Sequence, residues 1–123
     1  MAKMKKSPEP GTVVLLDFPG VTGTKRRPAV VLSSALYHKE RPDVIVGLIT
    51  SQTAAAIAAT DYALLDWRAA GLHRESAFRS FLVTLPRSGL IGWIGKLSER
   101  DWLVVRERVQ SALAPPKAMP TAE

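Results

Sequence analysis

The sequence predicts a mainly β fold: a small, strongly curved β-barrel of about six strands that a C-terminal α-helix closes on one side. Two observations predict it. Short segments rich in apolar and β-branched residues alternate with Pro, Gly and polar residues that are typical of turns. Near the end of the chain, Ser98 precedes Asp101 and a series of apolar residues at helical spacing. Short strands followed by one helix are typical of small barrels.

Length and composition indicate one globular domain. The chain has 123 residues, of which 46% are hydrophobic, which is enough for one modest core. We expect residues 1–10 to be a flexible basic leader, residues 11–114 to be the barrel domain, and residues 115–123 to be a disordered tail. Neither an internal repeat nor a linker is expected to divide the chain.

Charge and residue usage narrow the class of partner. Seventeen Lys and Arg against eleven Asp and Glu give a formal net charge of +6, which favours a polyanion or an acidic protein. The absence of cysteine excludes disulfides and thiolate metal sites. His38 and His73 are far apart in the sequence, so we expect no zinc site and no other cofactor. No apolar run reaches the ~18 residues of a membrane span, and no signal-type apolar core precedes Asp17, so we expect a cytoplasmic protein without a membrane segment.

Two apolar runs at the start of the domain are expected to pair. Residues 12–18 are predicted to be a buried strand. Residues 29–32 are predicted to be another, with Pro28 as its first residue because proline cannot donate to a sheet ladder. Pro-Gly and a second Gly within residues 19–24 indicate a hairpin loop. This loop is either a plain connection or a segment that closes over a ligand at Arg27.

Three consecutive cations, Lys25, Arg26 and Arg27, lead into the second strand. They can be a solvated strand start that contributes to solubility. Alternatively, the strand fixes Arg27 close to the core and makes it an anion site, most plausibly for phosphate, because a guanidinium offers a planar fork of donors.

The middle of the chain alternates polar and apolar stretches. Residues 35–42 are predicted to be a polar connection, in which His38 is expected to be a solvated loop residue rather than a catalyst. Residues 43–50 are predicted to be the third strand, and it ends in the polar cluster from Thr50 to Thr53. This cluster is either ordinary turn and capping chemistry or the lining of a polar site. Residues 53–60 are rich in alanine and form either a short helix or a loop.

The second half is predicted to contain three more strands and the helix. The strands cover residues 62–67, 78–85 and 90–96, and the two glycines of the last one suggest a bulge or a close backbone approach. Residues 68–72 and 86–89 are predicted to be turns, and residues 73–76 an exposed polar segment.

The helix after Ser98 is expected to end before Pro115 and Pro116. Its buried face is predicted to contain Trp102, Val105, Val109, Ala112 and Leu113. The three tryptophans have two possible roles. We expect core packing for each, with stacking on RNA bases as the alternative, for Trp67, Trp93 and Trp102.

Taken together and in order, several segments resemble the MazF/PemK family of toxin endoribonucleases. The matching segments cover roughly residues 11–113: residues 11–18, 27–33, 49–52, 67, 70–72, 76 and 94–98. The resemblance implies an SH3-like barrel, a homodimer and metal-independent cleavage of single-stranded RNA to a cyclic phosphate and a 5′-hydroxyl. It also implies inhibition of translation and growth, and a cognate antitoxin, for which we expect an acidic disordered segment.

The same resemblance implies site residues. By position, Arg27 and Thr50 match the family's catalytic arginine and threonine. We expect substrate contacts from the remaining residues of these two signatures and from two later arginines: Lys25, Arg26, Ser51, Gln52, Arg79 and Arg87.

The proton acceptor is left open. Some branches of the family use an arginine and an aspartate two residues apart on a later strand, and here Phe81 stands where that acid would be, after Arg79. Arginine stays protonated, with a free pKa above ~12, so Arg27 is a poor base. His38 could act only if its loop folds back.

Two other classes of function remain possible. One is a barrel that binds RNA or protein without cutting, which the phenylalanine at position 81 favours. The other is a toxin of similar shape that inhibits a topoisomerase, against which Arg27, Thr50 and their neighbours argue.

Overall fold

The structure is a computed structural model that describes residues 7–20, 23–56 and 58–114. The first six residues of the predicted leader and the predicted tail over residues 115–123 lie outside these ranges, and so do residues 21–22 of the predicted hairpin loop.

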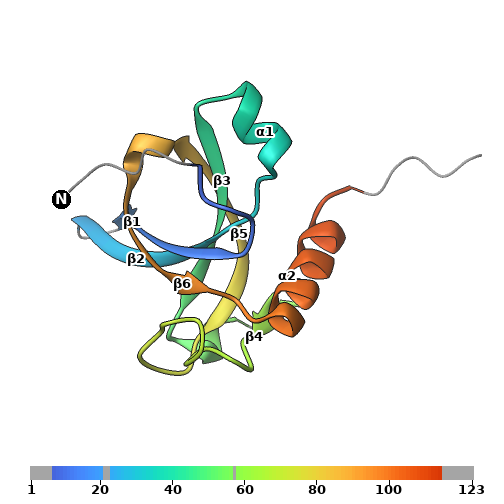
Figure 1. Ribbon diagram of the computed structural model, residues 1–123. Helices are drawn as coiled ribbons and strands as arrows, with labels where there is room; N and C mark the ends of the chain where they lie inside the picture. The colour runs from blue at the N-terminus through green and yellow to red at the C-terminus, as the bar shows by residue number, and fades with distance from the viewer. Residues whose placement is uncertain (1–6, 21–22, 57, 115–123) are drawn as a thin grey trace, which may run out of the picture.

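The described residues form one six-stranded antiparallel sheet in the order β4-β5-β3-β2-β1-β6 (Figure 1). The strands are β1 (Thr12–Gly20), β2 (Gly23–Val31), β3 (Asp43–Thr50), β4 (Tyr62–Ala63), β5 (Ala77–Pro86) and β6 (Leu90–Lys96). Two α-helices, α1 (Ala35–Glu40) and α2 (Glu99–Ala112), and two 3₁₀ turns, η1 (Thr53–Ala55) and η2 (Arg87–Gly89), complete the fold. The sheet curls into a partial barrel and α2 lies against one side of it, as the sequence predicts (Figure 1).

Both faces of the central strands are buried. Val13 packs in a cluster that includes Val105 of α2, whereas its neighbour Val14 packs in a second cluster. On β2, Val30 and Val31 divide between the two clusters in the same way. Successive side chains of a strand point to opposite faces, so a strand with a core on each side needs a continuous apolar run. This arrangement explains why these segments do not alternate between apolar and polar residues.

The predicted hairpin of β1 and β2 is confirmed, but β2 begins earlier than expected. It starts at Gly23, and Pro28 lies inside it, paired with Leu15 of β1. The pairing of β2 with β3 covers only Ala29 to Val31, so β2 has one partner strand at Pro28. Proline is tolerated in a strand where one side lacks a partner. The three cations therefore lie on the strand itself rather than before it.

Two other segments differ from the prediction. Residues 35–40 form α1 instead of a loop, because the Ser34 hydroxyl caps the first turn by accepting the Tyr37 N–H at 3.2 Å. The fourth strand covers Tyr62–Ala63 alone, because the N–H groups of Leu65 and Asp66 donate to the Asp101 carboxylate instead of to a neighbouring strand.

The close backbone approach predicted for β6 is confirmed. A Cβ added at Gly95 would lie 2.3 Å from the carbonyl oxygen of Ala70. The ladder between β1 and β6 also shifts register twice. These features bring the segment around Ala70 directly against β6.

The helix α2 begins where predicted. The Ser98 hydroxyl accepts the Asp101 N–H at 3.3 Å. Val105 is buried, and Trp102 and Val109 pack against the core as expected, but Ala112 and Leu113 are exposed. None of the described core residues packs against this last turn, so the predicted apolar face is too long.

His38 and Trp93 lie in environments opposite to those expected. His38 is buried, and its Nε2 lies 2.6 Å from the Ser33 hydroxyl. Burial and, to a lesser extent, the charge of Arg87 lower its pKa. Trp93 is 53% exposed on β6, because the side chain before Ile94 points away from the core that Ile94 contacts.

The domain's contacts begin before residue 11. Pro8 is buried, and Glu9 forms an ion pair with Lys96 of β6 at 3.0 Å. No helix within the described part of the chain is long and apolar enough to cross a membrane.

Candidate nucleic-acid interface

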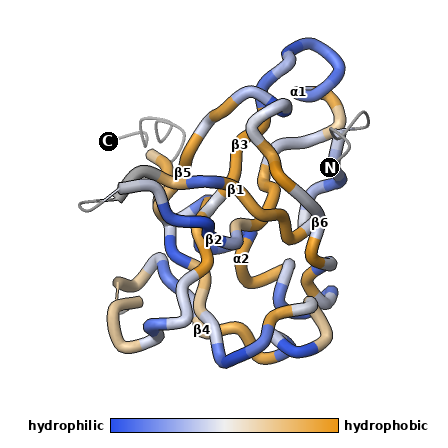
Figure 2. Tube along the Cα trace, turned by 90° about the vertical axis from the view of Figure 1, so that its left-hand side faces the viewer, coloured by the Kyte–Doolittle hydropathy of each residue, from blue (hydrophilic) through white to orange (hydrophobic). Residues whose placement is uncertain are grey.

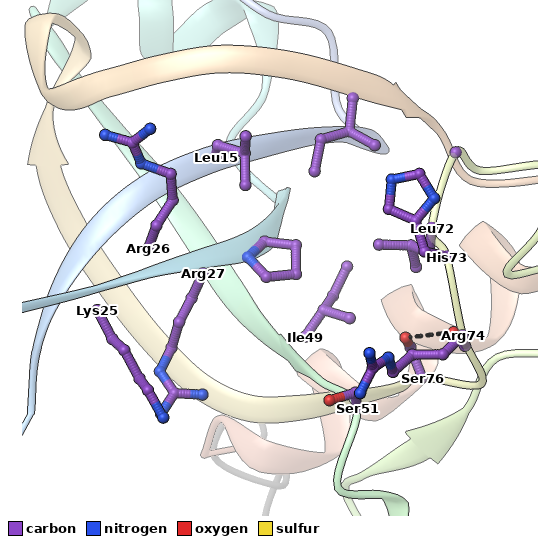
Figure 3. Close-up of a pocket in the computed structure, with 13 residues that line it drawn as sticks. Leu15, Lys25, Arg26, Arg27, Ile49, Ser51, Leu72, His73, Arg74 and Ser76 are labelled. Atoms are coloured by element: carbon purple, nitrogen blue, oxygen red, sulfur yellow. Dashed lines mark hydrogen bonds between the residues drawn. The ribbon is translucent and has the colours of Figure 1, made fainter.

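A pocket of about 470 Å³ opens between β2, the end of β3 and the segment that follows Ala70 (Figure 3). Its apolar lining includes Leu15, Pro28, Ile49, Gly71, Leu72 and Ile94. Its polar lining includes Lys25, Arg26, Arg27, Ser51, His73, Arg74 and Ser76. Four permanent cations and two hydroxyls around one space of this size favour a ligand with negative charge.

The strand β2 supplies three of the cations. Lys25 and Arg27 extend from it in the same direction in Figure 3, whereas Arg26 points the other way. Alternation along a strand produces this division, and Arg26 forms an exposed ion pair with Asp17 of β1 at 3.4 Å. Figure 2 shows this hydrophilic stretch of β2 in blue. Arg27 is half-buried on this strand.

The end of β3 positions a hydroxyl in the pocket, that of Ser51, which follows the last residue of the strand. Ile49 and Ser51 line the pocket, whereas Thr50, between them, is not part of the lining. The Thr50 Oγ1 instead accepts the Gln52 N–H at 3.0 Å. Thr50 therefore stabilises the turn that presents Ser51.

The segment from Gly71 to Ser76 completes the pocket, and sequence reasoning did not identify its role. His73 and Arg74 are exposed as predicted, but Ser76 is buried, and its hydroxyl donates to the Arg74 carbonyl at 2.8 Å. A basic pair between the apolar Leu72 and a polar residue was visible in the sequence. Its place in the same pocket lining as Arg27 was not, because this depends on how a long connection folds back across the sheet.

Three of the residues expected to bind substrate lie outside the pocket lining. Gln52 is exposed beyond Ser51, and Arg79 is half-buried on β5. Arg87 lies at the other end of β3, where Asp43 pairs with Pro86, and it donates to the Ser7 hydroxyl. The eight residues of β3 separate the two ends by roughly 23 Å at 3.3 Å per residue. Arg87 and the pocket therefore cannot contact the same phosphate.

Phe81, at the position of the family acid, is 47% exposed on β5 and packs edge to face on Phe18, with ring centroids 5.5 Å apart. It provides an apolar contact and does not line the pocket.

A buried carboxylate anchors the chain that leads to the pocket. Asp101 is fully buried and accepts three hydrogen bonds, from the Tyr62 hydroxyl at 2.6 Å and from the N–H groups of Leu65 and Asp66 at 3.1 and 2.8 Å. Burial and the hydrogen bond to Asp101 raise the pKa of Tyr62 to about 12. The acid expected three residues after the Ser98 cap thus also fixes the start of the segment that carries His73.

A second carboxylate at the same place faces solvent. Asp66 accepts two hydrogen bonds from Arg100, both at 2.7 Å, and one from the Ser98 hydroxyl at 2.6 Å. These donors lower the pKa of Asp66 to about 2, with Arg100 as the largest cause. Two sets of interactions therefore join the start of α2 to the segment that leads to the pocket: the buried hydrogen bonds of Asp101 and the ion pair of Asp66 with Arg100.

Among the described residues, no group of three His, Asp or Glu side chains is placed to hold a metal ion.

Comparison with known proteins adds a family and a set of similar structures. Residues 9–113 match the family of PemK-like, MazF-like toxins of type II toxin–antitoxin systems. No curated protein matches the chain by sequence.

Several solved structures share the fold. A mycobacterial endoribonuclease in complex with its cognate antitoxin has a TM-score of 0.72 and 17% identity over 91% of this chain and 100% of that one. MazF in the MazE–MazF complex from Deinococcus radiodurans has a TM-score of 0.68 and 23% identity over 89% of this chain and 98% of that one. The Mycobacterium tuberculosis toxin MazF-mt6 has a TM-score of 0.63 and 21% identity over 80% of this chain and 94% of that one. At these identities the structures establish the fold, and the family match covers nearly the whole described domain. The chain therefore belongs to the PemK-like, MazF-like toxins of type II toxin–antitoxin systems.

Proposed function

We propose that this protein is the toxin of a type II toxin–antitoxin system, and that it cleaves single-stranded RNA without a metal ion. The observation that carries the proposal is the pocket in which Arg27 and Lys25 of β2 face Ser51 and the His73–Ser76 segment. Family membership and the endoribonucleases of the same fold support it.

The chemistry that we propose uses the RNA as its own nucleophile. The 2′-hydroxyl attacks the adjacent phosphorus, and the products are a 2′,3′-cyclic phosphate and a 5′-hydroxyl. A site for this reaction must align the backbone, stabilise the extra negative charge on the phosphoryl oxygens and move protons. Fixed cations and hydroxyls meet the first two needs.

Arg27 is the residue to which we assign charge stabilisation. It is half-buried on a strand, so little reorganisation is needed when charge develops. Lys25 and Arg74 would neutralise the neighbouring phosphates. The Ser51 hydroxyl would donate to a phosphoryl oxygen, and Thr50 would keep Ser51 in place through its bond to Gln52.

The remaining predicted contacts would lie further along the RNA. Arg79 and Gln52 would bind nucleotides outside the pocket, and Arg87 would bind a more distant part of the backbone. The exposed ring of Trp93 would offer a stacking surface for a base.

We also propose that the toxin is a homodimer and that an antitoxin with an acidic disordered segment blocks its site. Cleavage of cytoplasmic RNA would inhibit translation and growth, so the cell needs such a partner. The net charge of +6 and the cationic pocket suit an acidic segment.

The test of catalysis uses purified protein, a long RNA of mixed sequence and excess chelator. We expect discrete fragments with cyclic-phosphate and 5′-hydroxyl ends. Arg27→Ala should lose most of this cleavage while melting at the same temperature as the wild type. The matched control is Lys39→Ala, which removes an exposed cation on α1 outside the pocket.

Cleavage by Arg27→Ala at the wild-type rate would contradict the assignment, and so would a strict requirement for magnesium. RNA that binds tightly and remains intact would instead indicate a binding module.

A further inference from the structure

We propose that His73 is the proton acceptor of the cleavage reaction, an inference that rests on the proposed function. The cations and hydroxyls of the pocket can hold and polarise a phosphate, but the 2′-hydroxyl must also lose a proton. At the position where some branches of the family have an acid, this chain has Phe81, which does not line the pocket. A base must therefore come from another position in this chain.

Among the residues that line the pocket, His73 is the best candidate for the base. Among the described lining residues the titratable groups are Lys25, Arg26, Arg27, His73 and Arg74. Lysine and arginine are protonated at neutral pH, whereas imidazole gains and loses its proton between about pH 5 and 8. No carboxylate belongs to this lining. The other histidine, His38, is buried and lines a separate pocket beside residues 7–10.

The charged groups that share the described pocket lining with His73 are all cations. The strand β2 brings three cations, and Arg74 follows His73 directly. The strands β1, β3 and β6 contribute the uncharged Leu15, Ile49 and Ile94, and the uncharged Ser51 follows β3. The imidazole therefore shares the lining of the pocket with cations and hydroxyl groups.

His73 is exposed, yet its backbone is anchored on both sides. The buried Leu72 donates its N–H to the Trp67 carbonyl at 3.1 Å. The buried Ser76 accepts the Leu64 N–H at 3.0 Å through its carbonyl. At Gly71, with φ +90°, an added Cβ would lie 2.7 Å from the Ile94 carbonyl oxygen, so the segment is seated tightly on β6. His73 is thus presented to the pocket from a fixed support, beside Leu72 in Figure 3.

For this reaction, one stretch of RNA backbone must contact both sides of the pocket. A space of about 470 Å³ is in the range that holds one small organic ligand. With the phosphate held by Arg27, the adjacent ribose can present its 2′-hydroxyl to the segment opposite. The neutral imidazole of His73 then takes the 2′-hydroxyl proton as the bond from O2′ to phosphorus forms. The bond from phosphorus to O5′ breaks, O5′ takes a proton from water, and the imidazolium returns its proton to solvent.

The experiment first maps a cleavage site and then uses a short oligonucleotide with a single ribonucleotide at that site. His73→Ala should reduce kcat/KM by about 10²- to 10⁴-fold, the usual contribution of a general base. Its affinity for the 2′-deoxy analogue should stay within about threefold of the wild type. The matched control is Glu75→Ala, which alters an exposed residue of the same segment outside the pocket lining and should retain wild-type rates.

Three further readouts separate a base from a structural residue. Wild-type kcat/KM should fall on acidification, and His73→Ala should lack this limb of the profile. Added imidazole should partly restore the rate of His73→Ala. A substrate with sulfur in place of O5′, whose leaving group needs no proton, should remain a poor substrate for His73→Ala.

The outcomes distinguish this inference from the proposed function. If the wild type cuts RNA, Arg27→Ala is inactive and His73→Ala stays within about threefold of the wild type, only the role of His73 is wrong. Full recovery on the sulfur substrate would show that His73 donates a proton to the leaving group instead. A defect confined to binding, or a lower melting temperature that accounts for the loss, would also overturn it. If the wild type cuts no RNA, both proposals fail.

Discussion

We propose that Thr50 and Ser51 share the role that the family resemblance gives to Thr50 alone. The Ser51 side chain lines the pocket, whereas the Thr50 hydroxyl accepts the backbone N–H of Gln52. Removing that acceptor leaves the turn after β3 without its local hydrogen bond, and Ser51 would shift. Small shifts in a positioning group cost large factors in rate, up to about 100-fold for 1 Å.

Thr50→Ala should therefore lose most RNA cleavage, by roughly tenfold or more, while Thr50→Ser, which keeps the acceptor, should retain it. The measurement is the initial cleavage rate of one oligonucleotide by both variants and by Ser51→Ala. Wild-type cleavage by Thr50→Ala, together with an inactive Ser51→Ala, would show that the serine alone supplies the hydroxyl.

At the scale of single residues, the sequence predicted that Arg27 leads into a buried apolar run, because that depends only on its neighbours along the chain, although β2 already begins at Gly23. It failed for His38, whose burial depends on a hydrogen bond to Ser33 that a polar loop did not suggest. It also gave no role to His73. Which side chains meet across a pocket depends on how β2 and a segment more than 40 residues later fold together, and no local pattern encodes that.

At the scale of elements, two carboxylates with different surroundings join the start of α2 to the segment that follows β4. Asp101 is buried under Tyr62 and backbone donors, whereas Asp66 forms a partly solvated pair with Arg100. The pair links α2 to the segment that leads to the pocket. Its loss should therefore lower the stability of the folded protein without altering the strands.

The pH dependence of this pair follows from the low pKa of Asp66, about 2 in the folded protein against an ordinary value of 3.8. The unfolded chain takes up a proton at this group more readily, so the pair stabilises the fold above pH 3.8 and the benefit is lost as the pH falls towards 2. Arg100→Gln should lower the melting temperature at pH 7, and the difference from the wild type should shrink between pH 4 and pH 2.

Thermal melts at a series of pH values measure this difference. Arg106→Gln, which removes another exposed cation of α2, is the control and should show no such convergence. A gap between Arg100→Gln and the wild type that is unchanged at pH 2 would mean that Arg100 stabilises the fold through something other than Asp66.

At this scale the sequence predicted β3 and β6 to the residue, because each is a compact apolar run between clear turn residues. It overestimated β4. Tyr62 to Trp67 has strand-like composition, but its backbone donors are captured by Asp101, which lies 35 residues or more further along the chain. Capture of this kind is a tertiary interaction that composition does not reveal.

At the scale of the whole molecule, a domain this small is proposed to act as a two-fold dimer, in which the RNA groove runs along or across the interface. Sedimentation equilibrium at micromolar concentration should give twice the mass of 13.4 kDa. A monomer that still cleaves RNA at the wild-type rate would contradict the dimer as a functional requirement.

The positive charge of the molecule favours control by an acidic partner. Arg27, Lys25 and Arg74 converge on one pocket, and Arg79 adds a cation on β5. A disordered acidic segment could lie along this surface, with carboxylates on the cations and apolar side chains on the barrel. It would then compete directly with RNA and would raise the melting temperature by mass action.

We therefore expect RNA to displace the antitoxin, and antitoxin binding to weaken with added salt because solvent screens the exposed charges. The measurement is a titration of RNA against the toxin–antitoxin complex at two salt concentrations, repeated with Arg27→Ala and Arg79→Ala. Both substitutions should lower antitoxin affinity, whereas Lys39→Ala on α1 should not. Simultaneous binding of RNA and antitoxin would show that the antitoxin acts elsewhere on the toxin. Unchanged affinity in both arginine variants would lead to the same conclusion, because a segment that covers the pocket must meet at least one of these cations.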